Sequence, residues 1–264
     1  MAAPTQTITG LVLRRTKLGE TDVIATILAE DGSQYKAVAK GARKPTSSFA
    51  SRLEVFAVAT ILFAQGKSLD IVKEVRLVEG NDALRCDFTR SSAASPLVDL
   101  LAKATFQDQP TPRLFALATS TLTTLGTTKE DPFVLTVAGM LKALAFLGFK
   151  PTFQECVECG TSIDLSRIDK QPFSYFDGGS VCPHCATRHE TTLLDAAMLQ
   201  WCNTLLYSTL DEVATFQIPE PTIHDALRFI DEWIRIHLGL NLRSLTFIFK
   251  NILMHPSRSE PHMS

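Results

Sequence analysis

Alternation of apolar and polar positions dominates the first third of the chain. Five short runs rich in β-branched residues stand out there, at 7–14, 22–29, 34–41, 52–64 and 69–78. A turn-forming Glu-Asp-Gly-Ser sequence at 30–33 separates the second run from the third. This pattern is typical of strands joined by hairpins. Strands without a helical pattern between them predict a small barrel, because closure pairs the free edges of a sheet.

A period of about 3.6 residues replaces the alternation beyond residue 80. The predicted helices cover about 95–106, 111–126, 131–148, 193–210, 222–239 and 242–253. A proline follows Thr111 and another follows Asp131, as is usual at helix starts. The predicted fold class is therefore α+β, with a five-stranded oligonucleotide-binding (OB) barrel followed by an α-helical bundle. An SH3-like barrel is the nearest alternative for the strands.

Four of the six cysteines form two C-x2-C pairs, Cys156 with Cys159 and Cys182 with Cys185. Each pair presents two thiolates from one tight turn, and two pairs complete a tetrahedral site. Four protein ligands leave no open position, so we predict one structural zinc ion without a catalytic role. An iron–sulfur cluster, a lone redox-active pair and knuckles without metal are the alternatives. We interpret the nearby His184 and His189 as surface residues.

The composition divides the chain into four predicted parts. Residues 1–80 form the barrel, residues 81–150 and 190–254 the helical domain, and residues 151–189 a zinc-binding element inserted in it, with a flexible tail at 255–264. The opening residues lack the pattern of a secretory signal, and no apolar run approaches the roughly 18 residues of a membrane span. We therefore expect a cytoplasmic protein with no membrane partner, where disulfides are rare.

Charge is distributed unevenly between these parts. Residues 1–80 hold eleven basic and eight acidic residues, a net charge of +3, whereas the whole chain carries −2. Basic residues cluster at 13–17 and 40–52, and such clusters neutralise nucleic-acid phosphates without reading a base sequence. Solvated surface charge is the alternative. The candidate DNA-binding residues are Arg14, Arg15, Lys17, Lys36, Lys40, Arg43, Lys44, Arg52 and Lys67.

Aromatic residues add a candidate for base stacking. Phe49 lies inside the basic segment and is the better candidate, whereas Phe56 and Phe63 lie in apolar runs and are predicted to be core. Signatures of catalysis are missing from the sequence, including a Walker-type phosphate loop, the G-x-S-x-G elbow and H-E-x-x-H. We therefore expect that the protein is not an enzyme.

Several segments together are similar to the RecO family of bacterial recombinational-repair proteins. They are GLVLRRTKLGETDVIATILAEDGSQYKAVAKGARK (10–44), SRLEVFAVATILFAQGKSLDIVKEV (51–75), CVECG (156–160), FSYFDGGSVCPHC (173–185) and HLGLNLRSLTF (237–247). The resemblance covers nearly the whole chain, and the order and spacing of the segments make it specific.

The resemblance implies an OB barrel followed by a helical bundle with a zinc module. It also implies a non-enzymatic task near the nucleoid: binding single- and double-stranded DNA and annealing complementary strands. RecR and RecF are the implied partners in placing RecA on strands coated by single-strand-binding protein (SSB), whose acidic C-terminal tail is recognised. The DNA-contacting surface of the family carries over to Arg14, Arg15, Lys36, Lys40, Arg43 and Lys44, whereas Lys17, Arg52 and Lys67 are added from charge alone.

The resemblance leaves some properties open, and two other functions are compatible with the residues. Some family members lack the cysteines, which favours a stabilising role for the metal, and a monomer is expected for the isolated protein. A zinc-containing adaptor whose barrel binds RNA or protein would bind DNA too weakly for physiological salt. A thiol oxidoreductase would need one C-x2-C pair free and reactive.

Overall fold

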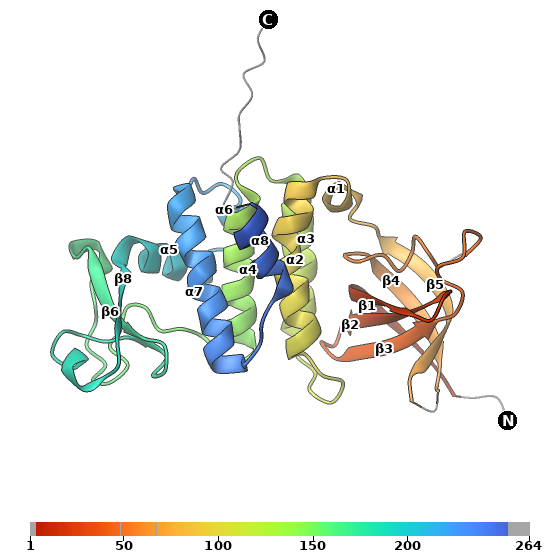
Figure 1. Cartoon of the computed structure of the whole chain (residues 1–264), viewed down its shortest axis with the longest axis horizontal. Coiled ribbons are helices and arrows are strands. Elements are labelled where there is room, and N and C mark those ends of the chain that lie inside the picture. The colour runs from red at the N-terminus through yellow and green to blue at the C-terminus, as the bar shows by residue number, and fades with distance from the viewer. Residues whose placement is uncertain (1–3, 48, 67, 253–264) are drawn as a thin grey trace, which may run out of the picture.

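The computed structural model describes residues 4–47, 49–66 and 68–252. A β-barrel, a helical bundle and a small sheet follow one another along the long axis of the molecule, so that the bundle separates the other two (Figure 1). The predicted tail at 255–264 lies outside the described residues. No helix in the described part of the chain is both long and apolar enough to span a bilayer.

The barrel is formed by β1 (Thr5–Leu18), β2 (Asp22–Ala29), β3 (Gln34–Ala39), β4 (Val58–Ala64) and β5 (Asp70–Glu79). In the described residues these strands close in the order β1-β2-β3-β5-β4, with β1 and β4 paired as well. All pairs are antiparallel except β3 with β5. This confirms the predicted five-stranded barrel of the OB type.

Alternation along the strands places one set of side chains inside the barrel. Small residues such as Ala25, Ala37 and Ala59 share this interior with Ile61 and Phe63. The opposite set on β1 and β2, which includes Leu11 and Leu28, packs with the helices in a second cluster. The barrel is therefore buried on its inside and also along the part of its outside that faces the bundle.

The predicted strand at 52–64 is wrong in its first half, because β4 begins only at Val58. Leu53 is buried in the barrel interior, whereas Phe56 is buried in the cluster shared with the helices. Phe56 adopts a left-handed backbone conformation with φ of 76°, and Asn81 Nδ2 donates to its carbonyl oxygen across 2.8 Å. The apolar run therefore contains a turn that serves two cores.

The helical part is built from α1 (Asp82–Arg85), α2 (Phe88–Ala104), α3 (Pro112–Thr127), α4 (Pro132–Phe146), α5 (Ala196–Tyr207), α6 (Leu210–Val213), α7 (Glu220–Leu238) and α8 (Arg243–Asn251). The helix predicted at about 95–106 begins later than α2 does, and α1 and α6 were not predicted. Asp131 caps α4 by accepting from the amide of Phe133 across 2.9 Å. Thr111 precedes α3 without a side-chain cap, so Pro112 alone marks that start.

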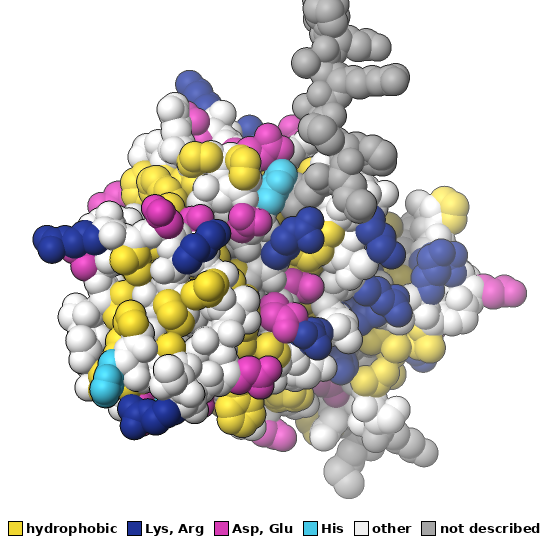
Figure 2. All heavy atoms as spheres, turned by 60° about the vertical axis from the view of Figure 1, so that its left-hand side comes forward, with side chains coloured by type: hydrophobic (Ala, Val, Ile, Leu, Met, Phe, Trp, Pro, Cys, Tyr) yellow, Lys and Arg dark blue, Asp and Glu magenta, His cyan; other side chains and the backbone are white. Residues whose placement is uncertain are grey.

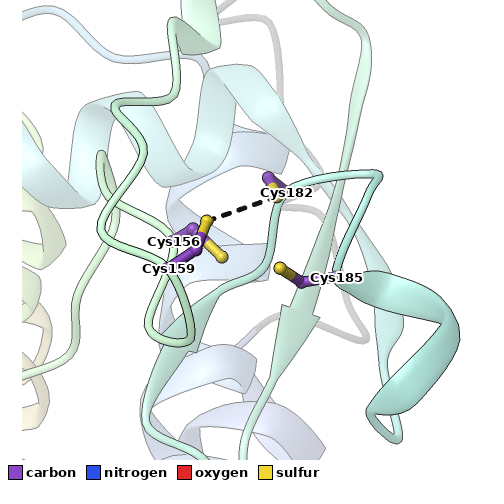
Figure 3. A group of neighbouring side chains, drawn as sticks. All are labelled: Cys156, Cys159, Cys182 and Cys185. Carbon is purple, nitrogen blue, oxygen red and sulfur yellow. Dashed lines mark hydrogen bonds between the residues drawn. The ribbon is translucent and has the colours of Figure 1, made fainter.

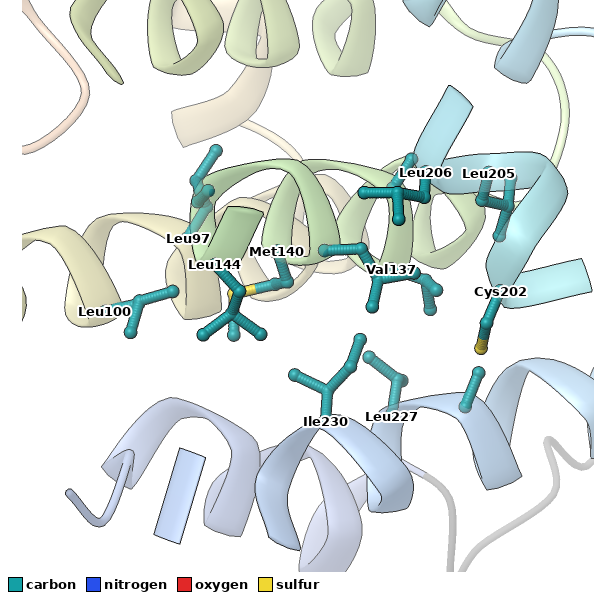
Figure 4. Close-up of a cluster of buried hydrophobic side chains, with 14 of the residues drawn as sticks. Leu97, Leu100, Val137, Met140, Leu144, Cys202, Leu205, Leu206, Leu227 and Ile230 are labelled. Carbon is teal, nitrogen blue, oxygen red and sulfur yellow. The ribbon is translucent and has the colours of Figure 1, made fainter. Parts of the chain in front are cut away.

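Helix α4 lies at the centre of the bundle. Its Val137, Met140 and Leu144 are almost fully buried. Figure 4 shows them between side chains of α2, α5 and α7, among them Leu97 and Ile230. Because α4 is buried over nearly its whole length, its sequence is apolar on all sides and shows little amphipathic period.

Gln34 at the start of β3 joins the barrel to the bundle. Its side chain is buried, and Nε2 donates to the carbonyl oxygen of Ala102 across 3.1 Å and to Oγ1 of Thr105 across 3.0 Å. The amide of Gln34 also donates to the carbonyl oxygen of Phe106 across 3.2 Å. These bonds connect β3 to the C-terminal end of α2.

The segment between α4 and α5 contains a sheet of β6 (Lys170–Ser174), β7 (Gly179–Ser180) and β8 (Thr192–Asp195), with two short 3-10 turns, η1 (Leu165–Arg167) and η2 (Ala186–Arg188). Strand β6 lies between the other two in the described residues. The first turn predicted for the helix at 193–210 is therefore strand β8, and its Asp195 caps α5 at the amide of Met198. The domain boundaries remain a prediction, and we propose that the inserted element extends through β8.

Candidate nucleic-acid interface and metal centre

Two predicted basic residues lie in one row across the outer face of the barrel. Arg14 on β1 pairs with Thr26 on β2, and Thr26 pairs with Lys36 on β3. Directly paired residues point to the same face of a sheet, so Arg14 and Lys36 flank Thr26. Both basic side chains are exposed. Lys17 is also exposed, but it pairs with Val23, whose side chain lies in the barrel interior, so Lys17 is on the other face of β1 from Arg14.

The loop after β3 is attached to the turn between β1 and β2. Asp22 Oδ1 accepts from the amide of Gly41 across 2.8 Å. This bond, with one from the hydroxyl of Thr21 and the charges of Lys40 and Lys44, holds the pKa of Asp22 below its ordinary value. The charges of Lys40 and Lys44 thus lie at the tip of the β1–β2 hairpin, and both side chains are exposed.

Three of the predicted basic residues are engaged by the protein itself. Arg43 Nη1 donates to the backbone carbonyl oxygens of Gly19 and Glu20. Arg15 forms an ion pair with Glu54, and its side chain is only 21% exposed. Arg52 Nη1 donates to the carbonyl oxygen of Val75 across 3.1 Å, although the residue as a whole is exposed. Lys67 lies outside the described residues. The sequence did not single out Glu54, an acidic residue just after a basic segment.

The aromatic residues lie mostly inside. Phe56 and Phe63 are buried, which confirms the core prediction. Phe49 is half-buried and packs against the barrel interior, so the prediction that it is the best stacking residue is not supported. Tyr35 stacks on Phe63 with ring centroids 5.8 Å apart. Neither Phe49 nor Tyr35 is a free platform for a base.

The four cysteines of the two knuckles converge on one point. Figure 3 shows Cys156 and Cys159 facing Cys182 and Cys185 from the opposite loop, and all four sulfur atoms lie within 4.8 Å of one another. The Sγ atoms of Cys159 and Cys182 are 3.8 Å apart. Sulfurs at about 2.3 Å from one tetrahedral ion are separated by roughly 3.8 Å, so this donor set fits a metal ion.

Hydrogen bonds around the sulfurs favour thiolates unequally. Hydrogen bonding from the side chain and amide of Thr161 lowers the pKa of Cys159 to about 6, and the Sγ–Oγ1 distance is 3.2 Å. Burial raises the pKa of Cys185 to about 12, although Arg188 Nη2 donates to its sulfur across 3.3 Å. A coordinated cation reverses such a rise, because it deprotonates the thiol. The sequence analysis did not identify Thr161 and Arg188 as partners of the sulfurs. Their positions, two residues after Cys159 and three after Cys185, were the available signal.

The two histidines near the knuckles differ. His184 is exposed, as predicted. The side chain of His189 is 15% exposed, so it is partly buried and not fully on the surface as predicted. Its Nδ1 lies 2.8 Å from Oδ2 of Asp177, and this bond raises the pKa of His189. Its Nε2 lies 3.3 Å from Oε2 of Glu158. His189 therefore joins the turn before β7 to the first knuckle.

The electrostatic character differs between the two ends. On the face seen in Figure 2, acidic and basic side chains alternate across the bundle, with apolar side chains scattered over the nearer end of the molecule. In the barrel, the charges of Lys40 and Lys44 lie close enough to Asp22 to lower its pKa. Because residues 1–80 carry a net charge of +3, the barrel is the better candidate for binding a polyanion.

Comparisons with known proteins cover most of the chain. The family model described as Recombination protein O N terminal matches residues 1–81, and that described as Recombination protein O C terminal matches residues 85–246. The DNA repair protein RecO of Desulfitobacterium hafniense (strain DSM 10664 / DCB-2) is 36% identical over 178 residues, which are 67% of this chain and 63% of that relative. The chain thus matches less than two thirds of this relative's length.

Other relatives are matched over almost their full length. The DNA repair protein RecO of Thermoanaerobacter sp. (strain X514) is 26% identical over 239 residues, which are 90% of this chain and 94% of the relative. That of Bifidobacterium longum (strain DJO10A) is 29% identical over 243 residues, or 90% of this chain and 96% of the relative. The residues matched by the two family models, 1–81 and 85–246, contain the barrel and all four knuckle cysteines.

Proposed function

The chain belongs to the recombination protein O (RecO) family, and from this premise we propose that it is a non-enzymatic DNA-binding mediator of recombinational repair. The observation that carries the proposal is the outer face of β1 and β3, where Arg14 and Lys36 flank Thr26 in one row. Exposed cations in a row attract phosphates of any sequence. We propose single- and double-stranded DNA as ligands, and action at the nucleoid.

The DNA surface that we propose has two parts. The first is the row of Arg14 and Lys36, with Lys17 exposed nearer the end of β1. The second is the loop after β3, in which Lys40 and Lys44 are exposed beside the hairpin tip. Arg43 and Arg52 contribute at the edges, where each already donates to a backbone carbonyl. Arg15 acts through its pair with Glu54, which positions the loop before β4.

Annealing follows from this surface without covalent chemistry. Two complementary strands repel each other through their phosphates, and cationic side chains that contact both backbones reduce that repulsion. Base pairs then nucleate while both strands stay bound. We propose that the protein anneals strands in this way and, with RecR and RecF, promotes loading of RecA on strands coated by SSB, whose C-terminal tail it recognises.

We propose one structural zinc ion held by Cys156, Cys159, Cys182 and Cys185. The ion would supply four coordinate bonds that tie the two knuckle loops together. Because the four sulfurs converge, neither C-x2-C pair stands apart as a redox couple. Because the site and the barrel lie at opposite ends of the molecule (Figure 1), the metal supports the fold of the inserted element and makes no contact with DNA.

The test is fluorescence anisotropy of a labelled single-stranded oligonucleotide titrated with the protein at several salt concentrations. We expect binding without sequence preference whose affinity falls steeply with salt. Strand annealing on SSB-coated DNA, with and without RecR, then tests the mediator role. Absence of binding even at low salt would overturn the proposal and favour an adaptor whose barrel binds RNA or protein.

A further inference from the structure

A pocket of about 270 Å³ lies where the barrel meets the bundle. Three segments line it: β3 with Gln34 and Lys36, the start of β5 with Ser68 and Asp70, and the loop after α2 with Phe106 and Gln107. Lys36 is also a member of the basic row on the outer face of the barrel. The pocket is therefore continuous with the DNA surface proposed above.

Phe106 lines this pocket, and its exposed side chain has no evident role in the hydrophobic core. The residue is 57% exposed, so its ring contributes little to the burial that stabilises the fold. Its backbone is nevertheless fixed, because its carbonyl oxygen accepts from the amide of Gln34 across 3.2 Å. The preceding Thr105 is buried and accepts from Gln34 Nε2 across 3.0 Å. The bonds to Gln34 on β3 therefore hold the backbone at Phe106 in place, while its ring stays exposed to solvent.

An exposed aromatic ring beside a cation matches the two parts of a nucleotide. Every base has a π-face that stacks on an aromatic side chain, and proteins that bind single strands combine such platforms with basic grooves. The ammonium group of Lys36 suits a phosphate. The carboxylate of Asp70 repels a phosphate but accepts hydrogen bonds from the amino or imino groups of a base, and the amide of Gln107 both donates and accepts.

We propose that this pocket takes one unpaired nucleobase of single-stranded DNA, stacked on Phe106, with the adjoining phosphate at Lys36. The proposal rests on the function proposed above and adds to it a preference for single strands. A base in duplex DNA is stacked and paired, so it cannot enter the pocket without leaving the helix. Contact with Phe106 therefore distinguishes single strands from duplexes, whereas the lysines bind both.

Anisotropy titrations of the full chain with three labelled probes test this: a single strand, the same strand with abasic sites throughout, and a duplex. Phe106→Ala is expected to lower the affinity for the normal single strand about tenfold. The affinity for the abasic strand and for the duplex, and the salt slope, should stay as in the wild type. Phe106→Tyr should restore the binding of the normal strand.

Phe176→Ala is the matched control, because Phe176 is 85% exposed and lies in the inserted element, away from the barrel. Thermal unfolding of each variant checks that it folds. Equal affinity of Phe106→Ala and wild type for the normal strand, or an equal loss on the abasic strand, would overturn the stacking proposal alone. Failure of the wild type to bind any of the three probes would instead overturn the proposed function on which it rests.

Discussion

The guanidinium group of Arg43 donates to the backbone carbonyl oxygen of Glu20 across 2.7 Å, and to that of Gly19 across 3.2 Å. These bonds tie the loop after β3 to the turn between β1 and β2. Arg43 therefore has a structural role in addition to its charge, and its replacement would both move the loop and remove a cation. Lys40 and Lys44 are also exposed, and they are better probes of charge because reversing them does not remove these two bonds.

Reversing both lysines, in the variant Lys40→Glu/Lys44→Glu, should weaken binding of single-stranded DNA and leave the fold intact. Loss of two phosphate contacts should reduce the slope of log K against log salt by roughly 1.4. Anisotropy titrations at several salt concentrations measure this slope. The variant Lys129→Glu/Lys150→Glu makes the same change of charge on the helical domain, and it should bind as the wild type does. Equal slopes in the two variants would contradict a DNA surface at this loop.

Replacing one knuckle cysteine, as in Cys185→Ser, should abolish stoichiometric zinc and lower the melting temperature. Cys185 is fully buried beside the other three sulfurs, so its loss leaves an incomplete site. Elemental analysis of the purified protein and thermal unfolding measure the two effects. DNA affinity should change little, because the barrel lies at the other end of the molecule (Figure 1).

Cys86→Ser is the control for that experiment, since Cys86 is exposed and is not one of the clustered cysteines. It should keep one zinc ion per chain and the melting temperature of the wild type. If Cys185→Ser retained the metal, the four-sulfur site would be wrong. Bound iron in place of zinc would point to the iron–sulfur alternative.

Asp22 should make stability depend on pH in the acid range. Hydrogen bonds from the amide of Gly41 and the hydroxyl of Thr21 lower its pKa in the folded state. A depressed carboxylate pKa stabilises the fold above the unfolded value of about 3.9, and this contribution is lost as the pH falls through the folded value. Wild type should therefore melt higher than Asp22→Asn at pH 7, and the difference should shrink below about pH 4.

Thermal unfolding of both proteins between pH 7 and pH 3 measures the effect of Asp22. Asp108→Asn, a change at an exposed position in the loop after α2, is the control. A difference between wild type and Asp22→Asn that stayed constant over this range would show that the charge of Asp22 does not contribute.

Gln34→Ala should destabilise the junction of the barrel and the bundle by about 1–3 kcal/mol, because it leaves buried acceptors at Ala102 and Thr105 without their donor. Chemical denaturation measures the free energy of unfolding. Gln65→Ala is the control, since Gln65 is exposed. Separate unfolding of the two parts in Gln34→Ala would show that this contact also couples them, whereas an unchanged unfolding curve would contradict the assigned role.

Local sequence determined much of this protein. Two-residue alternation in the runs at 7–14, 22–29, 34–41 and 69–78 indicated four of the five strands, because neighbouring side chains in a strand point to opposite faces. Proline after Asp131 marked the start of α4, since proline suits the first helical position. The C-x2-C spacing brought each pair of cysteines together within one turn. Each of these features depends on residues that are close in the chain.

Tertiary structure decided the features that depend on distant partners. The local pattern predicts one strand through Leu53 and Phe56. In the structure the chain turns between them, and the two side chains are buried in different cores. The local sequence predicts a free cation at Arg15, yet Arg15 pairs with Glu54, which lies 39 residues later in the chain. Nothing in the local sequence distinguishes Phe106. Its position in one pocket with Lys36 depends on the bond between its carbonyl oxygen and the amide of Gln34 on β3. A local pattern fixes which way a side chain points, but packing of remote segments fixes what it meets.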